Sequence, residues 1–141
     1  MMEVDMQREW HCQQQLTRLF YYLDQRRYED LVDLFEPDGV WLRQGRLLSG
    51  RADIRQAMQA RPVTYYICHI VSNFLVTGDS GGNVVAYLSA YASDNGQMPV
   101  PPVLITAPLG IFRVNAQFSS GDRPRIARLD LHPEFTFPKS T

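Results

Sequence analysis

The residue with the clearest potential for chemistry is His69, which lies in the segment YYICHIVSNFLVT at residues 65–77. Side chains alternate between the two faces of a β-strand, so a strand here places His69 and Asn73 on one face among mostly apolar neighbours. An imidazole titrates near neutral pH, and the pattern therefore indicates an ionisable group at the base of an apolar pocket. A core histidine that is hydrogen-bonded to a neighbouring group fits the same pattern.

Both faces of this expected strand are largely apolar, which predicts that the strand is covered on both sides. Cys68 lies on the face opposite His69, and we expect it to be a small buried hydrophobic residue. The face with His69 carries Tyr65, Ile67, Val71, Asn73 and Leu75, and the opposite face carries Tyr66, Cys68, Ile70, Ser72, Phe74 and Val76.

Helical periodicity comes before this strand. Apolar residues at helical spacing predict a long amphipathic helix over residues 3–24 and a shorter helix over 28–35. The second helix is expected to end at the turn signal of residues 36–39, and a short hairpin follows around 43–45. A third helix opens near Ser49 or Gly50 and ends before Pro62.

Strand periodicity continues after residue 77. Further strands are expected at 84–93, 103–118 and 124–131, with a break at Pro108 because proline cannot donate to a sheet ladder. Residues 132–141 are expected to form a tail. Helices that are segregated from an antiparallel meander predict an α+β fold rather than alternating βαβ units.

Composition limits the classes of function. A chain of 141 residues predicts a single domain over residues 1–141, and 45% hydrophobic with 21% charged residues is ordinary for a globular protein. A net charge of −1 leaves no electrostatic footprint for nucleic acid or for an anionic membrane. Arginines recur between residues 26 and 61, but acidic residues are interleaved with them, which favours a solvated face of mixed charge.

The number and spacing of the cysteine and histidine residues predict neither a disulfide framework nor a metal site. The two cysteines are too few for a disulfide framework, and the three histidines lie far apart without a metal-binding motif. The first ten residues contain no apolar signal region, and no apolar run reaches the roughly 20 residues of a membrane helix. We therefore expect a cytoplasmic protein without a metal site.

The order of motifs resembles a known superfamily. The first helix ends, and the second helix lies, within the segment LDQRRYEDLVDLFEPDGVW. The third helix opens with GRADIRQAM, and the following strand contains His-x-x-x-Asn at residues 69–73. Over about residues 5–132, this order resembles the nuclear transport factor 2-like superfamily and, within it, the SnoaL-like branch that includes scytalone-type dehydratases. The resemblance implies a cone, in which a curved, mixed or antiparallel sheet wraps around the long first helix and leaves a deep apolar pocket, with two further helices.

The resemblance also implies roles for residues. His69 would be the general acid/base and Asp24 would orient it or hold its charge, for dehydration or isomerisation of a hydrophobic cyclic hydroxy-ketone without a cofactor. Two parts of the pattern are altered here. The position of one phenol falls on Phe20, and the later-strand motif has Phe112 in place of a second phenol and Val114 in place of a carboxylate. The implied substrate-binding residues are Tyr22, Trp41, Tyr65, Asn73, Tyr91, Phe112 and Arg128.

Other interpretations remain open at this stage. The aromatic residues also fit strand or core packing, Arg128 fits a structural ion pair, and Asp24 fits a helix-terminal residue that bonds backbone amides. The departures at Phe112 and Val114 favour a non-catalytic protein that binds a small hydrophobic ligand. A third hypothesis is an accessory dimerisation subunit, similar to the small subunits of ring-hydroxylating dioxygenases. The resemblance further implies a homodimer formed through the outer face of the sheet.

Overall fold

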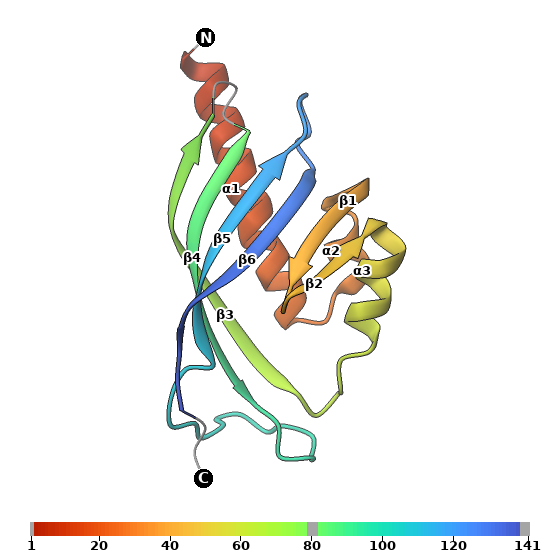
Figure 1. Cartoon of the computed structure of the whole chain (residues 1–141), viewed down its shortest axis with the longest axis vertical. Coiled ribbons are helices and arrows are strands. Elements are labelled where there is room, and N and C mark those ends of the chain that lie inside the picture. The colour runs from red at the N-terminus through yellow and green to blue at the C-terminus, as the bar shows by residue number, and fades with distance from the viewer. Residues whose placement is uncertain (1, 79–81, 139–141) are drawn as a thin grey trace.

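A long N-terminal helix and a curved six-stranded sheet form the molecule (Figure 1). The computed structural model describes residues 2–78 and 82–138. The elements in chain order are α1 (Met2–Asp24), α2 (Tyr28–Val32), β1 (Phe35–Arg43), β2 (Arg46–Ser49), α3 (Gly50–Gln59), β3 (Tyr66–Thr77), β4 (Asn83–Ser93), β5 (Gly110–Phe118) and β6 (Ile126–Thr136). This architecture confirms the predicted α+β class.

The sheet has the strand order β2-β1-β6-β5-β4-β3. Strands β3 to β6 form an antiparallel meander, whereas β1 runs parallel to β6. In Figure 1, α1 crosses one face of the meander, and β1, β2, α2 and α3 lie together beside β6. The sheet therefore has an inner face, which packs on α1, and an outer face.

The core lies between α1 and the inner face. Leu16, Leu19 and Leu23 are almost fully buried at helical spacing and face the sheet. On β1, the rings of Phe35 and Trp41 stack with centroids 5.9 Å apart. α1 ends at Asp24, so the part of the inner face beyond that residue is not filled by this helix.

Two predicted boundaries near the second helix were wrong. The helix ends at Val32 rather than Phe35, and the expected turn at residues 36–39 belongs to β1. The strand is irregular there, because its register with β6 shifts between Phe35 and Val40. Gly39 permits this irregularity, since a Cβ at that position would lie 2.8 Å from the carbonyl oxygen of Ile126.

The strands near the C-terminus also differ from expectation. β5 begins only at Gly110, after Pro108, so residues 94–109 form an irregular connection. The expected tail is in fact strand as far as Thr136, because β6 pairs with β5 up to Gly110. Pro133 is tolerated within β6 because the pairing with β1 stops at Asp130, and a missing N–H costs little where only one neighbouring strand remains.

A β-bulge divides β3 into two parts. The register against β4 runs from the Ser72–Tyr87 pair to the Leu75–Val85 pair, so β3 contains one extra residue. Asn73 occupies the bulge with a φ of 58°, a left-handed conformation that asparagine tolerates better than most residues. The extra residue reverses the alternation of faces, which turns Phe74 towards the core. The prediction that Asn73 shares a face with His69 was therefore wrong.

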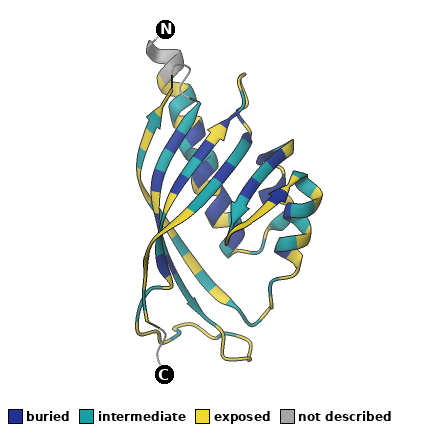
Figure 2. Cartoon of the chain, viewed as in Figure 1, coloured by how far each residue is buried: buried dark blue, intermediate teal, exposed yellow. Residues whose placement is uncertain are grey.

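The outer face of β3 is not covered within one chain, in contrast to the expectation of cover on both sides. Ile70 is 51% exposed and Leu75 is 60% exposed, and Tyr87 on the adjacent strand is 44% exposed. Figure 2 shows exposed residues alternating with half-buried ones along β3. Cys68 shares this face and is exposed rather than buried. Among the described residues, no helix is long and apolar enough to cross a membrane.

We predict that a second copy of the chain covers this outer face, because contiguous exposed apolar side chains mark interaction surfaces. Light scattering should then give about twice the chain mass of 16.2 kDa. Leu75→Arg should shift the protein towards the monomer, while Val63→Arg, at a residue that is 64% exposed outside the sheet, should not. A monomer at every concentration of the native protein would contradict the prediction.

Candidate active site

His69 and Asp24 are in direct contact across the junction of β3 and α1. Oδ1 of Asp24 lies 2.6 Å from Nδ1 of His69, and Oδ2 accepts a hydrogen bond of 2.7 Å from the backbone N–H of His69. Only 9% of the His69 side chain and 14% of the Asp24 side chain are exposed. One carboxylate therefore binds both the backbone and the ring of the same residue.

This contact determines the tautomer of the imidazole. A carboxylate only accepts hydrogen bonds, so Nδ1 of His69 must carry the proton that points to Asp24. In the neutral ring, Nε2 then has a free lone pair. If Nε2 takes up a proton, the imidazolium lies against the carboxylate, and a charge-assisted hydrogen bond stabilises it.

Several local features hold the pair in place. Asp24 is the last residue of α1, and Arg26 reverses the chain with a φ of 58°. The guanidinium of Arg26 donates to the carbonyl oxygens of Pro62 at 2.7 Å and Tyr65 at 2.6 Å, which ties the approach to β3 to the end of α1. On the core side, the rings of Phe20 and His69 lie with centroids 5.4 Å apart. These contacts limit rotation of the imidazole.

His69 lines a cavity of about 220 Å³ that begins where α1 ends. Its walls are largely apolar, with Trp41 from β1, Leu88 from β4 and Phe112 from β5. A cavity of about 150 Å³ can hold benzene, so this one suits a small ring system. The other lining residues are Leu23, Arg43, Gln44, Gly45, Arg61, Tyr65, Ile67, Ala90, Leu109, Leu131 and Pro133.

Three of the residues expected to bind substrate lie in this cavity. Trp41, Tyr65 and Phe112 line it together with His69. Tyr65 supplies a phenol, and burial raises the pKa of that phenol, although the charges of Arg61 and Arg43 act to lower it. The cavity thus combines a histidine, a protonated phenol and an apolar wall.

Four other expected residues lie elsewhere. Tyr22 is half-buried on α1, where the guanidinium of Arg27 lies 4.7 Å from its ring centroid. Asn73 occupies the β-bulge. Tyr91 pairs with Cys68 and therefore faces the outer side of the sheet. Arg128 is held by an ion pair of 3.0 Å with Asp130. The structure does not bring these four residues to the cavity around His69, and the ion pair is the structural role that the sequence also offered for Arg128.

The positions that depart from the resemblance are apolar in space as well as in sequence. Phe20 and Val114 are buried in the core, and Phe112 forms part of the cavity wall. They supply neither a phenol nor a carboxylate. Among the residues that the structure describes, no three His, Cys, Asp or Glu side chains are grouped so that they could hold a metal ion.

Sequence reasoning missed Arg43 and Arg61, which both line the cavity. They were included in the supposed solvated face of mixed charge, which does describe the ion pairs Arg27–Asp30 and Arg55–Glu29. One signal could have found Arg43. It lies two residues after Trp41 on the same strand, so both side chains point to the same side of the sheet.

Comparison with known proteins identifies the family. The model of the SnoaL-like domain matches residues 5–117. The chain belongs to the SnoaL-like family. No curated protein sequence matches it.

Solved structures share the SnoaL-like fold at low sequence identity. A proposed scytalone dehydratase from Novosphingobium aromaticivorans has a TM-score of 0.79 at 16% identity, and the match covers 100% of this chain and 93% of the other. ActVI-ORFA from Streptomyces coelicolor has a TM-score of 0.68 at 12% identity, with coverage of 88% and 95%. A proposed polyketide cyclase from Sinorhizobium meliloti has a TM-score of 0.58 at 20% identity, with coverage of 84% and 94%. At these identities, the likeness shows the fold alone.

We predict that His69 in this SnoaL-like protein carries its proton on Nδ1 when the ring is neutral, because Asp24 can only accept. Long-range ¹H–¹⁵N correlation spectra of the imidazole, assigned with His69→Gln, should show this tautomer. Asp24→Ala should remove the preference, whereas Asp33→Ala, at an exposed residue of α2's C-terminal end, should leave it unchanged. A native ring protonated on Nε2 would contradict the assignment.

Proposed function

We propose that this SnoaL-like protein is a lyase or isomerase that needs no cofactor and acts on a hydrophobic cyclic hydroxy-ketone. One observation carries the proposal: Asp24 orients His69, and the same histidine lines a largely apolar cavity. The relatives proposed as a scytalone dehydratase and as a polyketide cyclase agree with this class of substrate.

The chemistry proposed for His69 is proton transfer in both directions. Nε2 removes the proton from the carbon next to the ketone, and the electron pair of that C–H bond forms an enolate. The enolate then collapses to a carbon–carbon double bond as the C–O bond of the β-hydroxyl breaks, and the imidazolium returns its proton to the leaving oxygen, which departs as water. Such acid/base catalysis contributes about 10²- to 10⁴-fold in rate.

Asp24 and Tyr65 support this transfer in the proposal. Asp24 stabilises the imidazolium that exists between the two proton transfers, since its carboxylate is already bonded to Nδ1. Tyr65 is the phenol of the cavity, and its protonated hydroxyl can donate to the enolate oxygen. In the proposal, Tyr65 polarises the substrate oxygen, a role that the sequence alone assigned equally well to Tyr22, Tyr91 and Asn73.

Non-catalytic binding of a small hydrophobic ligand is the second candidate. It is favoured by Phe112 and Val114, whose apolar side chains replace the phenol and carboxylate expected at these positions. A protein of this kind would use the same cavity, and His69 would serve only as a hydrogen-bonding group. An accessory dimerisation subunit gains no comparable support, because such a role does not require a cavity around His69.

Dehydration of 3-hydroxy-1-tetralone separates these candidates, because the loss of water yields fluorescent 1-naphthol. We expect the native protein to accelerate this reaction above the rate in buffer. His69→Gln should lower the rate by about 10²-fold or more, because the base is lost. His132→Gln is the matched control, since His132 is exposed on β6, on the outer face of the sheet.

Binding of the tetralone without acceleration of its dehydration would favour the non-catalytic candidate. Full activity of His69→Gln would remove His69 from the mechanism. Circular dichroism of each variant shows whether the fold is retained, so a loss of rate can be attributed to chemistry.

A further inference from the structure

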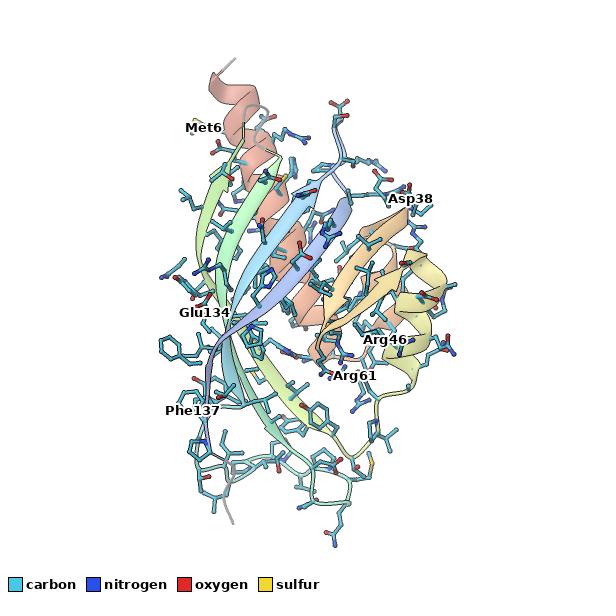
Figure 3. The ribbon with its side chains drawn as sticks, viewed as in Figure 1. Met6, Asp38, Arg46, Arg61, Glu134 and Phe137 are labelled. Carbon is cyan, nitrogen blue, oxygen red and sulfur yellow. The ribbon has the colours of Figure 1, made fainter. Side chains whose placement is uncertain are left out.

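Two arginines share the cavity with His69. Arg43 ends β1, and Arg61 follows α3, so two segments that are separate in sequence bring their guanidinium groups to one cavity. Figure 3 labels Arg61 close to the turn that joins β1 and β2. Gln44 and Gly45 of that turn complete this polar end, while Phe112 and Leu131 form apolar wall. The cavity is therefore polar and cationic at one end.

Neither arginine has an acidic partner among residues 2–78 and 82–138. Two other arginines of the same region have acidic partners, since Arg27 pairs with Asp30 and Arg55 pairs with Glu29. Arg43 instead lies with its guanidinium carbon 5.8 Å from the ring centroid of Trp41. No carboxylate of the described chain therefore neutralises either of the two positive charges at the cavity.

Arg61 retains unused hydrogen-bonding capacity. Its Nη1 donates to the carbonyl oxygen of Leu23 and to the hydroxyl of Tyr28, each at 3.0 Å. Its Nε is buried and has no acceptor within the described chain. A buried N–H without an acceptor in the protein is costly, so a ligand atom that accepts this hydrogen bond would be favoured.

The electrostatics point in the same direction. Burial lowers the pKa of Arg43, and the nearby positive charge of Arg61 lowers it further. Arginine still remains charged at neutral pH. Two like charges that are partly withdrawn from water destabilise one another, and an anionic ligand would offset this cost.

We propose that Arg43 and Arg61 form an anion subsite that binds a carboxylate of the ligand. The carboxylate accepts hydrogen bonds from the two guanidinium groups, and the ring system of the ligand lies against Trp41 and Phe112 with its reactive carbon towards His69. A carboxylate matches the planar fork of donors of an arginine. The placement of the reactive carbon rests on the proposed function, whereas the anion subsite does not.

Binding of two isosteric probes tests the subsite. 2-Naphthoate and 2-naphthamide have nearly the same shape, but only the first carries a negative charge. We expect isothermal titration calorimetry to show that the native protein binds the naphthoate at least tenfold more tightly. Arg43→Gln and Arg61→Gln should each remove most of this preference and should leave the affinity for naphthamide almost unchanged.

The matched control is Arg46→Gln. Arg46 belongs to the same hairpin as Arg43, and its substitution removes the same positive charge. Arg46 is exposed, however, and does not line the cavity. It should keep the preference for naphthoate within about twofold. Arg43→Gln is the decisive variant, because Arg61 also bonds backbone and Arg61→Gln can lower stability. Melting temperatures of all variants identify any loss of fold.

Several outcomes would overturn the proposal: equal affinity of the native protein for both probes, binding of neither probe, or a preference that survives in Arg43→Gln. Tighter binding of 2-naphthyl phosphate than of 2-naphthoate would overturn the assignment to a carboxylate. The His69→Gln variant separates the two proposals. If it binds naphthoate as the native protein does, the subsite stands, whether or not the native protein dehydrates the tetralone.

Discussion

The carboxylate of Asp24 connects the architecture to the chemistry. It accepts one hydrogen bond from the backbone of His69 and one from its ring, so a single side chain joins the end of α1 to β3 and selects the imidazole tautomer. Both partners are nearly enclosed, and hydrogen bonds are stronger where water is excluded. Because Asp24 holds the proton of the neutral ring on Nδ1, the lone pair of Nε2 remains free to accept a proton.

The position of the cavity follows from the length of α1. Leu16, Leu19 and Leu23 fill the inner side of the curved sheet, and the helix stops one residue later, at Asp24. Beyond that point β4, β5 and β6 continue without a helix over them, which leaves the space that His69 lines. The end of the helix thus sets both the depth of the cavity and the location of the carboxylate.

The cavity and the outer face illustrate why a shared fold does not define an activity. The SnoaL-like fold accounts for the curved sheet around α1, whereas the chemistry of the cavity depends on the side chains that line it. Phe112 makes one wall apolar, whereas Arg43 and Arg61 make one end cationic. The bulge at Asn73 also shapes the outer face, because it turns Leu75 outwards onto the exposed side of the sheet.

The sequence by itself determined the α+β class, the main helices and strands, and the choice of His69, since periodicity and local motifs are short-range properties. The choice of Asp24 came from the resemblance to the SnoaL-like branch. Only the tertiary structure decided which side chains share a cavity. A bulge moved Asn73 off the face of His69, strand pairing placed Tyr91 on the outer face, and chain reversal brought Arg61 beside β1. These outcomes depend on register and on contacts between distant segments, which residue type and spacing do not encode.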